Sequence, residues 1–470
     1  MAGRGGHRAG RTLVGCNAGL NGERVAENTP SSCRNLVIYE VYVRNHGPHG
    51  TFADVEADLP RIQSMGVDIV WFMPIHPIGK VNHKGTLGCP YSISDYRAIN
   101  PEYGTRADFA RLIERAHALG LKVMIDVVYN HTAHDSVLVR EHPEWFHQDE
   151  RGRPVTTVPD WSDVIDLQHP NQALSAYLIE TLQGWAQLGV DGFRCDVASL
   201  VPQDFWVQAR RDVARVKPGV TWLAESVHAA FIGYRRAMGL STISDSELYS
   251  AFDLTYDYDI WPIWQAAAAG KVPVARFLEM LRFQDAIYPA NFVKLRYVEN
   301  HDQARVMTIA PTRAQALAWT AFQAFNRGAF LIYGGQESAA THTPSLFDVD
   351  KVAWGSYELQ PFLTLLAHLK KDPAQAAGRF VLLDAEPAAQ ATWYLPGHSL
   401  YGVFNVGAAS GQLKVRVPDG SYADLLSDAA VRVQGGHMPI PDTAAILRYS
   451  GEINLEPCYS DLLDFNYSSE

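Results

Sequence analysis

Val190-Asp191-Gly192-Phe193-Arg194-Cys195-Asp196 is a short, mostly apolar stretch that ends in an arginine and an aspartate. Side chains at positions i and i+2 of a strand share one face, so Arg194 and Asp196 are predicted to point into the same space. A neighbouring guanidinium favours the ionised form of a carboxylate, which suits a nucleophile better than a proton donor. The alternative is a structural ion pair that holds the end of the strand.

Similar apolar strands alternate with amphipathic helices on both sides of this stretch. Strands are predicted over 36–43, 67–73, 121–128, 190–196, 220–225, part of 249–264, 292–299 and 330–333. Helices are predicted over 54–65, 106–119, 171–188, 202–216, 229–238, 274–283, 314–325 and 360–370. Eight strand–helix units predict the α/β class and a (β/α)₈ TIM barrel. An open doubly wound sheet is the alternative, but no glycine-rich phosphate loop follows the first strand.

The remaining segments differ from the barrel in composition. The predicted domains are a flexible leader over 1–34, the catalytic barrel over 35–377 with a short inserted segment after strand 3 at about 132–170, a C-terminal antiparallel β domain over 378–450, and a tail over 451–470. The leader is rich in Gly, Arg, Asn and Ser and lacks the apolar run of a signal peptide. The stretch Leu13-Val14-Gly15-Cys16 faintly resembles a lipoprotein cleavage box, so a lipid anchor is the alternative there.

Charge and hydropathy exclude several classes of partner. The chain has 470 residues, a formal net charge of −11 and no polybasic run, which argues against a nucleic-acid partner. It has no apolar window of about 18 residues, so no membrane-spanning helix is predicted. Without an export signal, we expect a cytoplasmic location; the oligomeric state is not indicated. The five scattered cysteines predict free thiols.

Polar side chains lie at the ends of four of the predicted strands. They are Asp126, Asn130 and His131 at the end of the third strand, Arg194 and Asp196 at the end of the fourth, Glu225 at the end of the fifth, and His301 and Asp302 after the seventh. Because a barrel of this type carries its reactive groups at the C-terminal ends of its strands, we expect these side chains to meet. Three of these acids, Asp196, Glu225 and Asp302, suit glycoside cleavage together with an arginine and two histidines. In that reaction one carboxylate attacks and a carboxylic acid protonates the leaving oxygen.

The expected environments assign roles to these groups. Asp196 is the candidate nucleophile, and Glu225 is the candidate acid because burial and neighbouring negative charge would raise its pKa. Asp302, His131 and His301 are expected to bind sugar hydroxyls. A metal site is the alternative for the histidines, but no pair of them has ligand spacing on one element.

These segments resemble the α-amylase family of glycoside hydrolases, glycoside hydrolase family 13. The residues that resemble its four conserved regions are 126–131, 192–196, 223–226 and 298–302. Tyr91, in the segment 88–96, resembles the tyrosine that stacks on the cleaved sugar, and 333–337 resembles the segment after the last strand. The resemblance spans about residues 36 to 450. It implies Asp196 as nucleophile, Glu225 as acid/base and Asp302 as stabiliser of the transition state, with Tyr91, Asp126, His131, Arg194 and His301 as substrate-binding residues.

The resemblance implies a retaining α-glucan hydrolase that cleaves α-1,4-glucosidic bonds in starch or maltooligosaccharides through a covalent glucosyl-aspartate. One alternative is a transglycosylase, in which a sugar hydroxyl replaces water. A second is an α-glucosidase or α-1,6-acting member, because the segment 164–168 has neither the amylase form nor the oligo-1,6-glucosidase form. A non-catalytic carbohydrate-binding relative is disfavoured, because all three acids are present.

The residues after the nucleophile differ from those of the calcium-binding members of the family. Calcium-binding members usually carry a Lys-His pair after the nucleophile, whereas Val197-Ala198-Ser199-Leu200 follows Asp196 here. Asn130 matches a calcium-ligand position, and Asp163 or Asp166 could supply further oxygens. We therefore expect no required cofactor, with Ca²⁺ at Asn130 as the alternative.

Overall fold

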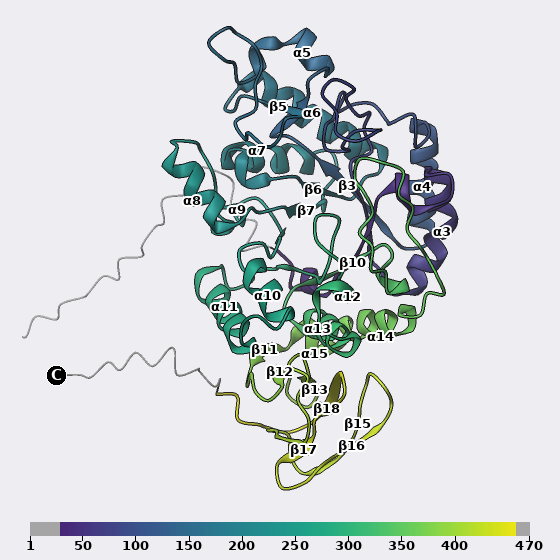
Figure 1. The fold of residues 1–470 in the computed structure, drawn as a ribbon, viewed down its shortest axis with the longest axis vertical. Helices are drawn as coiled ribbons and strands as arrows, with labels where there is room; N and C mark the ends of the chain where they lie inside the picture. The colour runs from purple at the N-terminus through teal and green to yellow at the C-terminus, as the bar shows by residue number, and fades with distance from the viewer. Residues whose placement is uncertain (1–28, 457–470) are drawn as a thin grey trace, which may run out of the picture.

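The computed structural model describes residues 29–456, and in it eight parallel strands surround an apolar core. Their order in the sheet is β8-β7-β6-β3-β2-β1-β10-β9. Figure 1 labels four of these strands, β7, β6, β3 and β10. The strands are β1 Val37–Val41, β2 Ile69–Phe72, β3 Lys122–Val127, β6 Gly192–Cys195, β7 Thr221–Ala224, β8 Leu254–Thr255, β9 Leu295–Arg296 and β10 Ala329–Tyr333. A parallel bridge between Thr255 and Lys294 joins the two ends of the sheet. The predicted (β/α)₈ barrel is confirmed.

Helices cover the outside of the barrel. They are α2 Val43–His46, α3 Phe52–Ser64, α4 Arg106–Ala118, α6 Gln172–Leu188, α7 Gln203–Ala214, α8 Ala229–Ala237, α9 Asp245–Leu248, α10 Trp261–Ala268, α11 Val274–Ile287, α12 Val306–Ile309, α13 Arg313–Phe325, α14 Gln360–Lys370 and α15 Pro373–Ala377. Shorter 3₁₀ turns are η3 Ala198–Leu200 and η4 Gln336–Ser338. Both α3 and α4 begin with a capping box, formed by Thr51 with Asp54 and by Thr105 with Asp108, which satisfies amide groups that the first turn leaves free.

The barrel departs from the sequence prediction between residues 249 and 299. Strands β8 and β9 have two residues each, so most of the apolar stretch 292–299 lies outside the ladder. The aromatic stretch 249–264 ends in helix α10, in which Trp261 and Trp264 are buried. Trp261 stacks on Tyr297, with ring centroids 4.6 Å apart. The preference of aromatic residues for strands is therefore outweighed by burial against neighbouring rings.

The end of the predicted leader, which spans residues 1–34, lies within the described part of the chain. Residues 1–28 of the predicted flexible leader lie outside the described range, but Ser31–Asn35 forms the 3₁₀ helix η1. The guanidinium of Arg34 donates to Ala376 O at 3.1 Å, and the Asn35 amide donates to Lys370 O. These contacts join η1 to helices α14 and α15.

The inserted segment follows β3. It contains the antiparallel strands β4 His131–Ala133 and β5 Val164–Asp166, with helix α5 Val137–Glu141 and the turn η2 Pro143–Trp145 between them. Trp145 and Phe146 are buried, which anchors the segment on the barrel.

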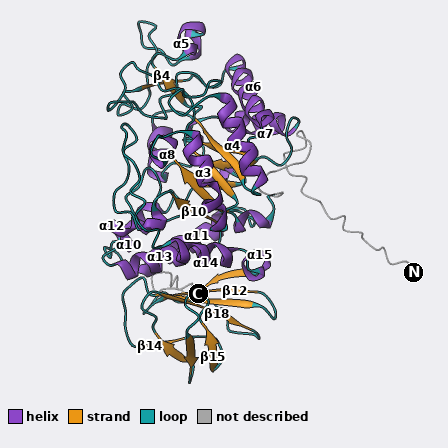
Figure 2. Ribbon diagram, turned by 90° about the vertical axis from the view of Figure 1, so that its right-hand side faces the viewer, coloured by secondary structure: helices purple, strands orange, loops and turns teal. Residues whose placement is uncertain are grey.

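A separate antiparallel β domain follows α15, at the lower end of the molecule in Figure 2. Its main sheet is β11 Arg379–Leu382, β12 Ala389–Tyr394, β13 Ser399–Phe404 and β18 Ala444–Tyr449, and its two-stranded sheets pair β14 Gln412–Lys414 with β17 His437–Pro439 and β15 Gly420–Ala423 with β16 Ala430–Val433. Helix α13 packs on β13 and β18. The expected C-terminal antiparallel β domain is confirmed. Strands β15 and β17 are mostly exposed and lack clear alternation, so their sequences do not indicate strands.

Two further expectations concern membranes and thiols. Within residues 29–456, no helix combines the length and apolar character that a membrane crossing needs. Cys33, Cys89 and Cys195 are free thiols, whereas Cys16, Cys458 and the tail beyond residue 456 lie outside the described range.

Candidate active site

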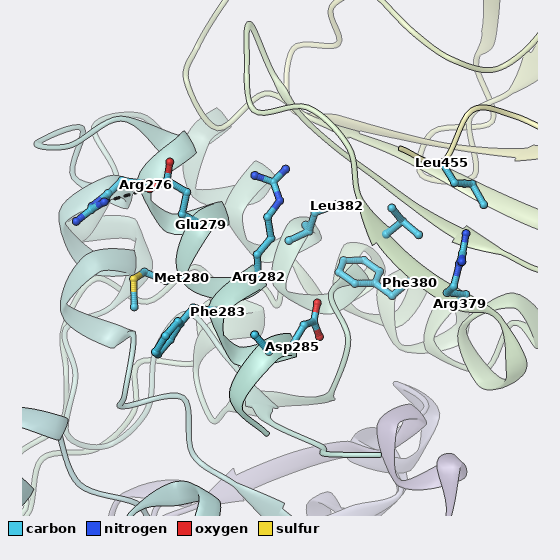
Figure 3. Close-up of a pocket in the computed structure, with 12 residues that line it drawn as sticks. Arg276, Glu279, Met280, Arg282, Phe283, Asp285, Arg379, Phe380, Leu382 and Leu455 are labelled. Carbon is cyan, nitrogen blue, oxygen red and sulfur yellow. Dashed lines mark hydrogen bonds and ion pairs between the residues drawn. The ribbon is translucent and has the colours of Figure 1, made fainter. Parts of the chain in front are cut away.

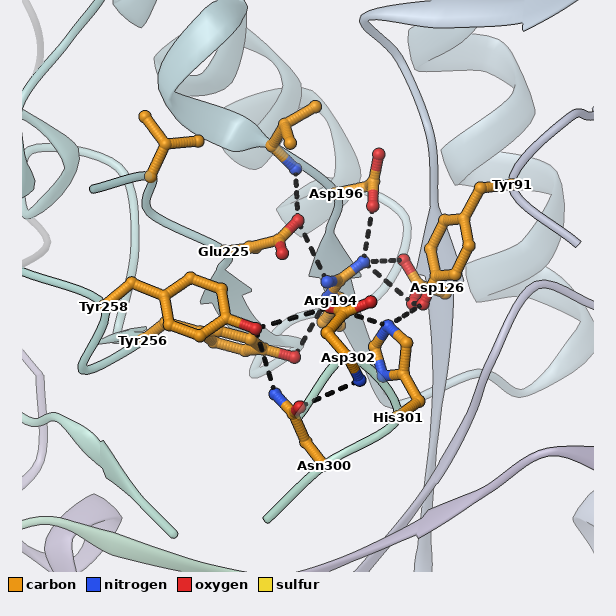
Figure 4. A network of polar contacts seen from close by, with 12 residues as sticks. Tyr91, Asp126, Arg194, Asp196, Glu225, Tyr256, Tyr258, Asn300, His301 and Asp302 are labelled. Atoms are coloured by element: carbon orange, nitrogen blue, oxygen red, sulfur yellow. Dashed lines mark hydrogen bonds and ion pairs between the residues drawn. The ribbon is translucent and has the colours of Figure 1, made fainter. Parts of the chain in front are cut away.

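Arg194 lies at the centre of a buried polar network at the C-terminal end of the barrel strands (Figure 4). Strands β3 and β6 pair in register, so that Asp126 lies beside Arg194. The Nη1 atom of Arg194 is 2.8 Å from Asp126 Oδ1 and 2.8 Å from Asp196 Oδ1, and its Nη2 atom is 2.9 Å from Glu225 Oε2. One guanidinium thus contacts three carboxyl groups on adjacent strands. The Arg194–Asp196 pair therefore belongs to a larger charged cluster and is not only an ion pair at the end of one strand.

Glu225 follows β7, and its orientation is fixed by two nitrogen atoms. Val197 N donates to Glu225 Oε2 at 2.7 Å, and the Arg194 contact uses the same oxygen. Val197 has a φ of 35°, a left-handed conformation that is strained for a β-branched residue. In this backbone conformation the Val197 amide points at the Glu225 carboxyl group. Oε1, which takes no part in these two contacts, is left to carry a proton.

The pKa values of the two acids differ as their predicted roles require. Burial raises the pKa of Glu225 to about 8, Arg194 opposes the rise, and Asp196 adds to it. Burial also raises the pKa of Asp196, to about 6, although Arg194 opposes this change. The expectation that the arginine alone would set the charge of Asp196 omitted this burial. At neutral pH Asp196 is still mostly ionised, whereas Glu225 is mostly protonated.

Asp302 and His301 form a second charged pair across the pocket. His301 Nε2 is 3.1 Å from Asp302 Oδ2, and its Nδ1 atom contacts the buried carboxylate of Glu40 on β1. Burial opposes protonation of His301, but Asp302 and Glu40 raise its pKa well above the usual range. Burial would raise the pKa of Asp302, but His301 lowers it. The pair therefore presents an ionised carboxylate beside an imidazolium.

Tyr91 and His131 complete the set of predicted side chains. The Tyr91 hydroxyl is 3.0 Å from Asp126 Oδ2 and 2.8 Å from His301 Nε2, and its ring stacks on His301 at 5.4 Å between centroids. His131 Nε2 is 3.9 Å from Asp196 Oδ2, and burial lowers the pKa of His131 to about 4, which leaves it neutral. The structure therefore brings all eight predicted catalytic and substrate-binding residues together.

The sequence analysis missed four residues of this network. They are Glu40, Tyr256, Tyr258 and Asn300. The Tyr258 hydroxyl donates to Asp302 Oδ2 at 3.3 Å and accepts from Asn300 Nδ2 at 3.2 Å. Asn300 precedes His301 and Asp302 directly, which was a usable signal; Glu40, within the apolar strand β1, was a second.

A cavity of about 230 Å³ opens above the network. Its lining includes the three acids, Tyr91, His131 and His301, together with Lys84, Cys89, Trp161, Asp163, Val164, Val197, Leu346 and Phe347. The lining thus combines carboxyl groups with the aromatic rings of Trp161 and Phe347. Carboxyl groups together with flat apolar rings suit a sugar, which presents both hydroxyls and an apolar face.

Comparison with known families decides the classification. Residues 26–161 and 158–377 match the alpha amylase catalytic domain, and residues 381–447 match the bacterial alpha amylase C-terminal domain. The chain belongs to the α-amylase family, glycoside hydrolase family 13.

Solved structures and curated relatives agree with this assignment. An α-amylase from Lactobacillus plantarum is 44% identical with a TM-score of 0.86, and the match covers 89% of this chain and 100% of that one. A noncanonic maltogenic α-amylase, AmyB from Thermotoga neapolitana, is 33% identical with a TM-score of 0.79, over 89% of this chain and 99% of that one.

Two curated relatives carry different activities in their names. The α-amylase MalA of Haloarcula japonica is 27% identical over 74% of this chain, and an α-1,4-glucan:maltose-1-phosphate maltosyltransferase of Mycobacterium tuberculosis is 32% identical over 46% of it. The chain spans about half the length of the first relative and about a third of the second.

The calcium ligands expected from the α-amylase family have other partners here. Asp163 Oδ1 is 2.8 Å from Lys84 Nζ, so an ammonium group already neutralises it. Asp166 accepts from the hydroxyl and amide of Thr157, and the Asn130 side-chain amide is 3.2 Å from His131 Nδ1. Within the described part of the chain, no group of three or more His, Cys, Asp or Glu residues could hold a metal ion. These residues do not fit calcium as they are arranged.

A larger hollow, of about 750 Å³, lies where the barrel of this α-amylase-family chain meets its C-terminal domain (Figure 3). Helix α11 and strand β11 line it with Phe283, Phe380 and several arginines, one of which, Arg276, is paired with Glu279 at 3.1 Å. None of the acids at the strand ends lines it. The smaller cavity above Arg194 is therefore the candidate active site.

Proposed function

We propose that this chain is a retaining α-glucan hydrolase that cleaves α-1,4-glucosidic bonds through a covalent intermediate on Asp196. The observation that carries the proposal is the contact of Arg194 with both Asp196 and Glu225. Retaining glycosidases hold their two carboxyl groups about 5–5.5 Å apart, closer than inverting ones. A single guanidinium that contacts both groups favours the closer spacing.

In the first half-reaction, Asp196 attacks the anomeric carbon of the bound sugar while Glu225 gives its proton to the leaving oxygen. The bond from carbon to the leaving oxygen breaks as the bond to the aspartate oxygen forms. Arg194 stabilises the ionised Asp196 and orients it. Asp302, beside the imidazolium of His301, binds hydroxyls of the distorted ring, and its negative charge stabilises the oxocarbenium-like transition state.

In the second half-reaction, Glu225 accepts a proton from the incoming water, and the resulting hydroxide displaces Asp196 from the sugar. Both substitutions invert the anomeric carbon, so the released sugar keeps its α configuration. Proton NMR at early times tests this outcome. Release of the α anomer first supports the proposal, and release of the β anomer first overturns it.

Transfer to a sugar hydroxyl is the second candidate, because a maltosyltransferase is among the relatives by name. Two solved structures named α-amylases match over 99–100% of their own length, at 44% and 33% identity to this chain. These matches support hydrolysis. Chromatography of the products from concentrated maltoheptaose distinguishes the two, because transfer yields products longer than the substrate.

The proposed reaction uses no calcium. The support is the Lys84–Asp163 ion pair and the hydrogen bonds of Asp166, which occupy the oxygens that a calcium ion would need.

A further inference from the structure

One loop between β2 and α4 crosses the mouth of the candidate active site. We call residues 81–87 the strap. On one side, the Lys84 ammonium is 2.8 Å from Asp163 Oδ1 and donates to Asp160 O at 3.2 Å. Both acceptors belong to the inserted segment after β3. The strap is therefore attached to that segment by an ion pair and a hydrogen bond.

On the other side, the strap is attached to the segment after β10. Leu87 N donates to Phe347 O at 2.9 Å, and the amide and hydroxyl of Thr86 donate to Asp348 Oδ1 at 2.9 and 2.7 Å. Gly85 has a φ of +63°, and a Cβ atom there would lie 2.4 Å from Phe347 Cβ. Only a glycine permits this close approach without a shift of the neighbouring chain.

The sheet order places the strap relative to the acids. The inserted segment follows β3 and Phe347 follows β10, and the strands β2 and β1 lie between these two in the barrel. Glu225 follows β7, which lies outside this arc and is separated from β3 by β6. The strap thus spans the rim on the side away from Glu225, while Lys84 and Phe347 line the same cavity as the acids.

The direction of cleavage determines which end of a bound glucan faces the strap. Glu225 protonates the leaving oxygen on C1, so the leaving part of the chain departs on the Glu225 side. C4, which carries the non-reducing part of a glucan, lies across the ring on the side of the strap. The cavity of about 230 Å³ is smaller than the roughly 300–1,000 Å³ of pockets that enclose drug-sized ligands, so little room is left for further sugars.

We infer that the strap closes the pocket behind the sugar held by Asp196, so that the enzyme attacks maltooligosaccharides from their non-reducing ends and releases glucose. This inference rests on the proposed function and adds the substrate class, a glucan with a free chain end. Lys84 is the residue that fastens the strap. Its side chain is 38% exposed and belongs to a loop, so we expect that Lys84 can be replaced without unfolding the barrel.

The wild-type enzyme tests the inference with two p-nitrophenyl maltoheptaosides, one with a free non-reducing end and one capped there by a 4,6-O-ethylidene group. We expect the capped substrate to be cleaved at least tenfold more slowly. Equal rates on both substrates would overturn the inference and leave the proposed function intact. If neither substrate is cleaved, the proposed function fails, and the inference fails with it.

Variants test the role of the strap itself. Lys84→Ala and the double variant Lys84→Ala/Thr86→Ala should raise the rate on the capped substrate relative to the free one by about tenfold, whereas Lys84→Arg should keep the wild-type ratio. Lys80→Ala is the matched control, because Lys80 is exposed and lies just outside the strap. A melting curve for each variant verifies folding. If the wild-type enzyme cleaves the capped substrate more slowly, but neither Lys84→Ala nor the double variant changes the ratio of the two rates, the assignment to the strap is wrong.

Discussion

Asp196 and Glu225 contact opposite nitrogens of one guanidinium: Arg194 Nη1 is 2.8 Å from Asp196 Oδ1, and Nη2 is 2.9 Å from Glu225 Oε2. The charge of Arg194 stabilises ionised Asp196, and its rigid fork fixes where Glu225 lies. Burial and mutual repulsion raise the pKa of Glu225 above that of Asp196. A nucleophile and an acid thus arise from two carboxyl groups that share one partner.

Replacement of the nucleophile should abolish turnover. Asp196→Asn keeps the size of the side chain but removes the charge that attacks the sugar, so we expect kcat to fall by roughly 10⁴-fold or more. Initial rates on maltoheptaose measure the effect. Asp204→Asn serves as a control, because Asp204 is exposed at the start of helix α7 and does not line the cavity. Activity of Asp196→Asn within tenfold of wild type would contradict the assignment.

The pH dependence of kcat/KM should be bell-shaped. Activity requires ionised Asp196, so it falls as pH drops below the Asp196 pKa of about 6. It also requires protonated Glu225, so it falls as pH rises above the Glu225 pKa of about 8. Glu225→Gln should lower kcat by about 10²–10⁴-fold and remove the alkaline limb for a substrate with a good leaving group, such as a p-nitrophenyl glucoside. An unchanged alkaline limb in this variant would assign that limb to another group.

Arg194 should matter for stability as well as for activity. Arg194→Ala leaves three buried carboxyl groups without their cation, a change that costs about 3–5 kcal/mol. Their pKa values then rise further, so the deficit in unfolding free energy should be largest above pH 8 and should shrink as pH falls toward 5 and the carboxyls become protonated. Arg194→Lys keeps the charge but cannot contact both sides, so it should restore part of the stability and little of the activity. Urea unfolding at several pH values measures both effects.

Removal of divalent cations should leave the enzyme intact. Dialysis against EDTA is expected to change neither the melting temperature nor kcat, because Lys84 and Thr157 already satisfy Asp163 and Asp166. Added Ca²⁺ should likewise have no effect. A melting temperature that falls by more than about 5 °C in EDTA and recovers with Ca²⁺ would show that the oxygens rearrange to bind the metal.

The three acids and Arg194 could be predicted because each lies at or just after the end of an apolar strand, and a parallel barrel gathers strand ends at one face. Glu40 could not be assigned in this way. It lies inside the apolar strand β1, and its partner His301 is 261 residues away in sequence. Tyr258 was missed because the short strand β8 leaves an irregular segment behind it. Short-range patterns carry no information on such distant contacts.

The contacts of the strap could not be predicted from the sequence either. Glycine at position 85 and threonine at position 86 read as an ordinary turn, and nothing near them in sequence indicates that they meet Phe347 and Asp348. Contacts between two long loops depend on the whole barrel, which holds their ends in place. The contact between Lys84 and Asp163 could not be predicted for the same reason, because the two residues lie on different loops.

Covalent trapping tests the central claim most directly. A 5-fluoro-α-glucosyl fluoride forms the glycosyl-enzyme quickly and hydrolyses slowly, so mass spectrometry of the intact protein should show the addition of one fluorinated glucosyl group. Peptide mapping should place that group on Asp196. An adduct on another residue, or no adduct while the reagent still inactivates or is consumed by the enzyme, would contradict a retaining mechanism through Asp196.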